Sequence, residues 1–188
     1  MRWLTLYARS RQVPASAAAV ALVALAVWAL HGSGPVDLMM AVLVLTANVV
    51  AVSIGLGGRD VVLERTAAIR WVLRRAAHTL LAGAFAGAAL LTVQAAGVQL
   101  APTEVVVRDS AGLVGLAALG AALCGAQFAW TLPTGWLAFT LLVPVPPGIV
   151  GEVGGWMIIS PATTASTGTA WALLATGTVL YATAGPRR

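Results

Sequence analysis

The sequence predicts an all-α integral membrane protein with six transmembrane helices in a single domain, residues 1–188. Of its 188 residues, 60% are hydrophobic and only 9% are charged, and the mean hydropathy is +0.92. Soluble domains are roughly 45–50% apolar and about 25% charged, so this chain lacks the polar surface of a water-soluble protein. The composition therefore excludes a cytosolic enzyme, a disulfide-stapled secreted domain and a disordered tail.

Six apolar runs follow one another along the chain. Crossing the hydrocarbon core takes about 20 residues, and a run in lipid has to be helical because each backbone N–H and C=O needs an internal partner. Gly83 and Gly87 form a GxxxG pattern in the third run, which predicts close helix packing. The predicted spans are Pro14–Leu30, Val36–Leu56, Thr79–Val98, Ala111–Leu132, Trp136–Ile159 and Gly168–Ala184.

The segment ahead of the first span is basic and aromatic. Residues 1–11 mix Trp3, Leu4 and Tyr7 with three arginines. Such a composition is typical of a short helix that lies along the cytoplasmic membrane interface. An unstructured basic tail is the alternative interpretation of this segment.

The arginines predict the orientation of the chain. Its net charge is +5, and every one of its 11 basic residues is Arg. These charges flank apolar runs, so membrane orientation explains them better than nucleic acid does, and cytoplasmic loops carry the excess of basic residues. With six spans, ten arginines fall on one side of the membrane: Arg2, Arg9, Arg11, Arg59, Arg65, Arg70, Arg74, Arg75, Arg187 and Arg188. We therefore expect a multi-pass protein of the cytoplasmic (inner) membrane with both termini in the cytoplasm.

The cytoplasmic connection after span two, Gly57–His78, is the most informative segment. It reads GGRDVVLERTAAIRWVLRRAAH, in which apolar residues recur at roughly helical spacing. One interpretation is a solvated connector that carries orienting charge. However, acidic residues contribute little to topology, so Asp60 and Glu64 favour a docking surface for a cytoplasmic partner. The candidate coupling residues are Arg59, Asp60, Glu64, Arg65 and Arg70.

The connection between spans three and four carries the single arginine expected outside. Arg108 and Asp109 precede a glycine-rich run, and Asp109 or Ser110 is expected to cap the helix that follows. A functional external ion pair between Arg108 and Asp109 is the alternative.

The fifth run is broken. Its string PVPPGIVGEVGG combines prolines, which remove hydrogen-bond donors and bend helices, with Gly154 and Gly155, which permit tight turns. We expect a helix that crosses, turns and partly re-enters from outside. Glu152 then lies either at the external interface or buried with a partner, and a buried position would mark function. With Trp156, these residues form the predicted gate or cargo path.

Catalytic and metal-binding motifs are missing from the sequence. Without any Lys the chain has no P-loop, and it has no HExxH and no pair of intramembrane carboxylates. The lone Cys124 excludes a structural disulfide and a Cys-based zinc site within one chain, and we expect it to be a small core residue. We therefore predict no enzyme activity, no metal and no cofactor on this chain. Transport would draw its energy from a partner, because intramembrane charge is nearly absent.

Three strings, together with the span order, carry a family resemblance. LGGRDVVLERTAAIRWVLRRAAH, RDSAGLVGLAALGAA and GTVLYATAGPRR look like parts of actinobacterial permease subunits. The chain as a whole resembles the permeases of ATP-binding-cassette (ABC) exporters of the six-helix, re-entrant (type V) class. At 188 residues, with short external loops, it is small for that family.

The resemblance implies a dimer of permeases that works with separate cytoplasmic ATPase subunits, which bind the ATP and Mg²⁺. The helix from Arg59 to Arg70 would insert into a cleft of the ATPase. We expect export of a hydrophobic or amphipathic compound, contact with membrane lipids and no nucleic-acid partner. The alternatives are a non-catalytic membrane scaffold or immunity-type protein and, third, an intramembrane enzyme or self-contained carrier.

Overall fold

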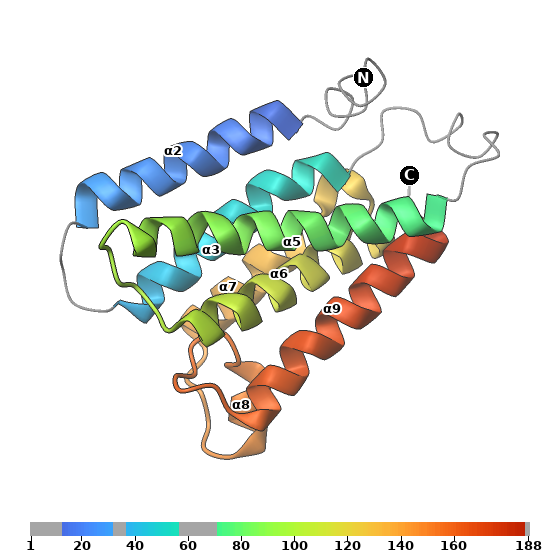
Figure 1. The fold of residues 1–188 in the computed structure, drawn as a ribbon. Coiled ribbons are helices and arrows are strands. Elements are labelled where there is room, and N and C mark those ends of the chain that lie inside the picture. Colours follow the sequence, from blue (N-terminus) through green and yellow to red (C-terminus); the bar gives the residue numbers. More distant parts are fainter. Residues whose placement is uncertain (1–12, 32–36, 57–70, 187–188) are drawn as a thin grey trace.

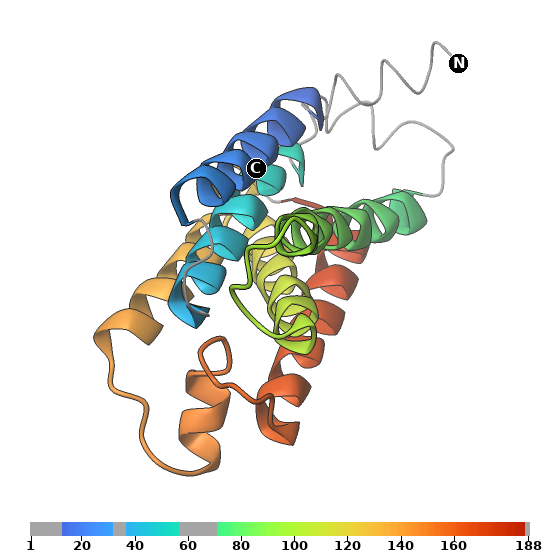
Figure 2. The ribbon, with the colours of Figure 1, turned by 60° about the vertical axis from the view of Figure 1, so that its left-hand side comes forward.

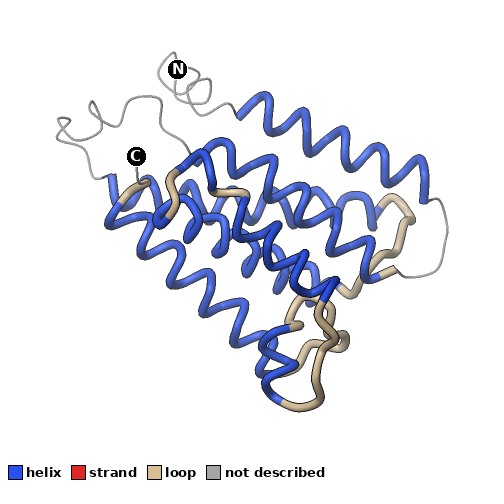
Figure 3. Tube along the Cα trace, turned by 180° about the vertical axis from the view of Figure 1, so that it is seen from behind, coloured by secondary structure: helices blue, strands red, loops and turns tan. Residues whose placement is uncertain are grey.

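The structure, a computed structural model, describes residues 13–31, 37–56 and 71–186. Within these ranges the chain forms seven α-helices and two short 3₁₀ helices, and it contains no strand (Figures 1 and 3). The helices are α2 (Val13–His31), α3 (Leu38–Ser53), α5 (Trp71–Ala95), α6 (Thr103–Leu123), α7 (Thr131–Leu142), α8 (Ile149–Gly154) and α9 (Thr164–Ala184), with η1 at Ile54–Leu56 and η2 at Ala126–Phe128.

Three of the described helical segments are long and apolar enough to cross a membrane. They are Leu38–Leu56, Trp71–Ala95 and Thr103–Leu123. The helices α2, α7 and α9 occupy the other three predicted positions, but α7 has only 12 residues. The all-helical class is confirmed, whereas the count of six spans stays a prediction.

Helix α6 lies at the centre of the molecule. From Arg108 to Ala122 every residue except Leu119 is buried. Most of these residues are Gly or Ala, which let neighbouring backbones approach closely. Consequently α6 can contact α3, α5, α7 and α9 at the same time.

Glycines allow α5 and α9 to pack closely on α6. On α5, a Cβ at Gly83 would come within 2.7 Å of Val114 on α6, which confirms the packing role predicted for the GxxxG pattern. On α9, a Cβ at Gly177 would overlap the backbone carbonyl of Gly115 on α6. The backbones of α6 and α9 therefore touch directly.

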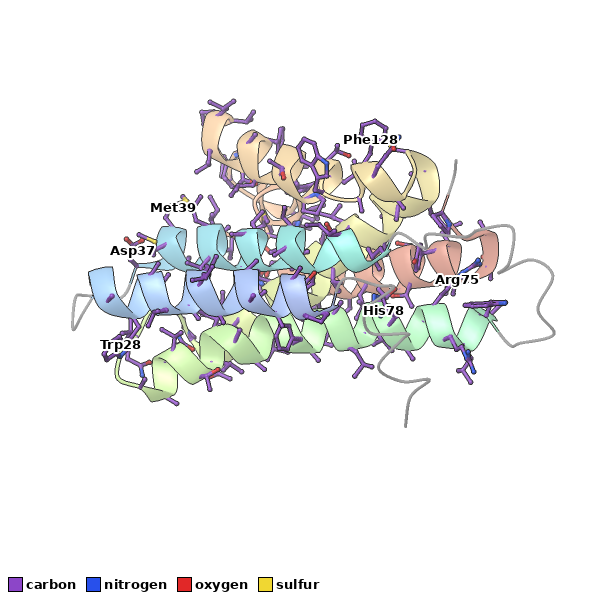
Figure 4. The ribbon with its side chains drawn as sticks, turned by 90° about the horizontal axis from the view of Figure 1, so that it is seen from above. Trp28, Asp37, Met39, Arg75, His78 and Phe128 are labelled. Carbon is purple, nitrogen blue, oxygen red and sulfur yellow. The ribbon has the colours of Figure 1, made fainter. Side chains whose placement is uncertain are left out.

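The helix ends divide between the two ends of the bundle. The first turn of α5 and the last turn of α9 lie side by side (Figure 1). In this region the guanidinium of Arg75 packs against Gly185. Trp28, near the end of α2, and Asp37, which caps α3 through a 3.0 Å bond from the Met40 amide, lie at the opposite end (Figure 4). The first turn of α5 and the last turn of α9 are thus separated from the end of α2 and the start of α3 (Figure 4).

Two sequence predictions are wrong. Helix α6 begins at Thr103 after Pro102, not at Ala111, so Asp109 lies inside the helix and does not cap it. The helix begins early because Val105 and Val106, in its first turn, are fully buried. Cys124 is exposed rather than in the core, and it follows the last residue of α6 as its C-cap.

Candidate functional site

The predicted break in the fifth run is present, and it separates α7 from α8. Helix α7 ends at Leu142, and the proline-rich connection leads to Gly148, whose φ of +89° suits glycine. Figure 2 shows this connection at the margin of the molecule, away from α5. The Trp136 indole on α7 donates a 3.1 Å hydrogen bond to the Gly154 carbonyl, so the two helices stay linked.

Helix α8 packs on the connection that precedes it. A Cβ at Gly151 would overlap the Pro146 carbonyl, and one at Gly155 would come within 2.7 Å of the Val145 side chain. By contrast, a Cβ at Gly154 would meet only Phe139, at 3.7 Å. Of the two glycines predicted for the gate, only Gly155 is therefore needed for close packing.

The chain after α8 turns inward against α6. Trp156 and Met157 are both 0% exposed. The six-membered ring of Trp156 lies over Gly112, where an added Cβ would overlap it. The predicted gate residue Trp156 is thus buried against the central helix α6, and the chain after α8 folds back onto the bundle.

Arg108 fastens this inward turn. Its Nη1 donates to the Ile159 carbonyl at 2.8 Å and to the Ser166 hydroxyl at 3.1 Å, while Nη2 lies 3.4 Å from the Met157 carbonyl. Its Nε donates to Asp109 Oδ1 at 2.8 Å. One guanidinium therefore joins α6, the chain after α8 and the first turn of α9.

The Arg108–Asp109 pair is buried, with 2% and 0% of the side chains exposed. Among the described residues, Asp109 Oδ2 and the Trp156 Nε1 have no hydrogen-bond partner. Buried charges in an apolar bundle are stable only when they are paired. We call Arg108, with the Asp109 and Ser166 side chains and the Met157 and Ile159 carbonyls that it contacts, the polar clamp. It has no nucleophile–base pair, and the described residues hold no group of metal ligands.

Ser166 belongs to the clamp but was not among the predicted site residues. It completes a capping box with Thr163, whose hydroxyl accepts from the Ser166 amide at 3.2 Å, while Ser166 Oγ accepts from the Thr163 amide at 3.0 Å. The T-x-x-S spacing ahead of an apolar run was the available signal. It indicates a helix start, but not that Arg108 would reach it.

The remaining predicted residues are placed as follows. Glu152 on α8 is partly exposed and has no ion-pair partner among the described residues, so it is not a buried, partnered carboxylate, and its place at the external interface stays a prediction. The coupling residues Arg59, Asp60, Glu64, Arg65 and Arg70 lie outside the described residues, as does the predicted N-terminal helix.

Both flanks of the 57–70 segment contact the last turns of α9. The Tyr181 hydroxyl donates a 2.6 Å hydrogen bond to the carbonyl of Leu56, the last described residue before the segment. Arg75, in the first turns of α5 after the segment, packs against Gly185. Sequence reasoning missed Tyr181, although a tyrosine in an apolar run usually needs a partner for its hydroxyl.

Comparison with known proteins adds no family. No protein-family model, no curated protein and no solved structure matches this chain. The functional argument therefore rests on the residues themselves: a central small-residue helix, a broken segment clamped to it by Arg108, and a charged connection whose flanks are held by α9.

Proposed function

We propose that this chain is the membrane-spanning permease subunit of an ABC exporter, energised by a separate cytoplasmic ATPase subunit. The observation that carries the proposal is the broken segment between α7 and α9, which turns back against α6 and is held there by Arg108. Irregular backbone at membrane depth is tolerated only where protein shields it. The part of the break that follows α8 is shielded in this way, because Trp156 and Met157 are buried, and a segment that folds back on the bundle is what the resemblance to re-entrant permeases leads us to expect.

The arrangement of helix ends supports the six-span topology. The flanks of 57–70 and the last turn of α9 meet at one end of the bundle, and Trp28 of α2 and Asp37, which caps α3, lie at the other end (Figure 4). In the proposed topology the arginine-rich end is cytoplasmic. The chain then presents 57–70 to the ATPase, and the break faces outside.

The cargo follows from the chemistry of the bundle. The described helices expose large apolar side chains, and the described charges within the apolar helices are a buried pair and residues near helix ends. Such a surface accepts an apolar or amphipathic compound, but it would not compensate a compact ion for its lost hydration. Two copies of the chain form the transport path between them.

The direct test is to purify the affinity-tagged chain and identify an ATP-binding subunit that comes with it. Glu64→Ala and Arg65→Ala should each abolish ATPase stimulation while the permease still inserts and folds. Removing one partner of a buried interfacial charge pair costs about 2–5 kcal/mol. Thr66→Ala, in the same segment, is the control. Full stimulation in both charge variants would remove the coupling assignment, and absence of an ATP-binding subunit would favour the scaffold alternative.

Topology is tested independently with single cysteines in a Cys124→Ala background. Ser33→Cys and Thr103→Cys should react with a membrane-impermeant maleimide added to intact cells, whereas Thr66→Cys should not. Labelling of Thr66→Cys from outside would overturn both the orientation and the coupling assignment.

A further inference from the structure

The first turns of α5 carry two neighbouring arginines whose side chains have different surroundings. The guanidinium of Arg75 packs against Gly185, where α9 ends. Arg74 lies over the indole of Trp71, with its Cζ 5.9 Å from the ring centroid. Successive residues of an α-helix are turned by about 100° around the axis. Arg75 therefore faces α9, whereas Arg74 is directed to another side of α5.

On the side of Arg74, α5 exposes a continuous apolar stripe. Leu81 and Phe85 are 68% and 44% exposed, and Ala77 and Ala88 are exposed as well. These four residues follow Arg74 at the spacing that places residues on one face of a helix, and we call them the outer stripe of α5. Arg74 thus stands at the end of an apolar surface that the bundle does not cover.

The length of α5 places Arg74 at the level of lipid headgroups. Trp71–Ala95 has 25 residues and is apolar enough to cross a membrane. Such a helix is about 37 Å long, whereas the hydrocarbon core of a bilayer is about 30 Å thick. The excess falls on the first turns, because a charge such as that of Arg74 is costly in hydrocarbon. A tryptophan in the position of Trp71 is typical of the membrane–water interface.

The charges at this end of the bundle favour an anionic ligand. Neither α5 nor α9 contains an acidic residue. A guanidinium can stack on an aromatic ring and still donate two N–H groups in its own plane to a phosphate. In a zwitterionic phospholipid the phosphate is accompanied by a cationic group, which an arginine repels. An anionic phospholipid is therefore the better match, and the outer stripe provides an apolar surface for its acyl chains.

From these observations we propose that Trp71, Arg74 and the outer stripe of α5 bind one anionic phospholipid. Arg74 binds the phosphate, Trp71 holds the guanidinium in position, and an acyl chain lies along the stripe. The other described arginines do not fit this role, because Arg108 is buried and Arg75 packs against Gly185. The inference goes beyond the proposed function and does not depend on it, since it requires only that α5 spans a membrane. In the proposed topology the lipid belongs to the cytoplasmic leaflet.

The experiment uses the full chain, purified in a neutral detergent. Native mass spectrometry measures the dissociation constant of the first bound lipid. The probes are dioleoylphosphatidylglycerol, which is anionic, and dioleoylphosphatidylcholine, which has the same acyl chains but is zwitterionic. One basic residue near anionic lipid corresponds to about a fivefold gain in affinity, so we expect the parent to prefer the anionic lipid by about that factor or more.

Arg74→Gln removes the charge and the phosphate-binding fork. We expect it to bind the anionic lipid about fivefold more weakly than the parent does, with unchanged affinity for the zwitterionic lipid. Arg75→Gln is the matched control, because it removes the same charge from the neighbouring residue, whose guanidinium faces α9. Its affinity for the anionic lipid should stay within about twofold of the parent value, since it leaves the Arg74–phosphate contact in place.

Each other outcome overturns the proposal. It fails if the parent does not prefer the anionic lipid, or if Arg74→Gln binds that lipid as the parent does. Equal losses in Arg74→Gln and Arg75→Gln would mean that net charge attracts the lipid, and displacement of the lipid by inorganic phosphate would identify a site for a free anion. If Arg74→Gln does not accumulate, Trp71→Leu is the second variant. It keeps the charge but removes the ring, and an unchanged preference for the anionic lipid in it contradicts the proposal.

Discussion

The α6–α9 pair and the α7–α8 arm (residues 131–154) are both apolar, but they are packed in opposite ways. In α6, small residues are buried along almost the whole helix, and the backbone touches that of α9. In the arm, Pro133, Thr140 and Gly151 are the buried helical residues, and the whole stretch from Leu141 to Val150 is exposed.

The difference lies in side-chain size rather than in hydrophobicity. Lipid is as apolar as Leu, so burying a large apolar side chain between membrane helices brings little advantage, whereas small residues allow close backbone contact. Leu142 and Ile149, 81% and 73% exposed, are therefore suited to face lipid or a second chain. The α6–α9 pair is the rigid frame, and the arm is attached to it at few points.

Gly177→Leu is expected to have one of the two largest effects. Its side chain would overlap the Gly115 carbonyl, and backbone atoms cannot give way as a flexible side chain can. Overpacking costs about 1–3 kcal/mol and occasionally more, so we expect a loss of stability of about 3 kcal/mol or above. The measurement is thermal unfolding in detergent. Gly168→Leu is the control on the same helix, because a Cβ at Gly168 would meet no atom within 4 Å, and it should have the melting temperature of the parent. Equal losses of stability in both variants would contradict the idea that close α6–α9 packing stabilises the bundle.

The second effect is that of Arg108→Leu. The substitution leaves Asp109 buried without its cation, and breaking a buried pair costs about 3–5 kcal/mol. The double variant Arg108→Leu/Asp109→Leu should recover part of this loss, because it also removes the unpaired charge. Unfolding of the two single variants and the double variant measures the coupling. Strictly additive losses would argue against a clamp.

A smaller and local effect is expected at the base of the arm. Gly155→Ala would press on Val145, whereas Gly154→Ala has room. A local destabilisation of about 1.4 kcal/mol corresponds to a tenfold change in an equilibrium. We therefore expect Met157→Cys, buried in the parent, to be alkylated about tenfold faster with Gly155→Ala and at the parent rate with Gly154→Ala. The same rate in both would mean that Gly155 does not hold the turn.

The smallest effect is expected on the arm's outer face. Ile149→Ser changes an exposed side chain, and surface substitutions usually shift stability by within about 0.5 kcal/mol. Leu113→Ser, at a fully buried position on α6, serves as the destabilised comparison in the same thermal unfolding assay. Should Ile149→Ser lose as much stability as Leu113→Ser, the arm would have to be covered by another chain.

Sequence reasoning located three of the described helices to within about four residues. The runs that became α2, α3 and α9 were placed almost correctly, because apolar length and flanking polar residues define such helices locally. The beginning of α6 was missed by eight residues (103 against 111). In the sequence, the adjacent charges of Arg108 and Asp109 suggest a loop, and only the structure shows the partners that allow them to be buried in a helix. Cys124 was misplaced for a related reason, since hydropathy does not report where a helix ends.

The candidate site was predicted only in part. Arg108, Asp109 and Trp156 were singled out, but not that they meet, nor that Ser166 and the Met157 and Ile159 carbonyls complete the cluster. Spacing along one chain does not specify contacts across about 50 residues. The two glycines at 154 and 155 read alike in sequence, and only their neighbours distinguish them.

The sequence by itself determined the helical class, the order of the helices, the break after α7 and the segregation of arginine to the segments that flank one end of the bundle. These features follow from hydropathy, proline and charge, which act over a few residues at a time. Only the tertiary structure decided that Arg108 is buried, that α9 contacts both Arg108 and Leu56, and that α6 is the central helix. Those are long-range contacts, and they depend on which small residues come to face one another.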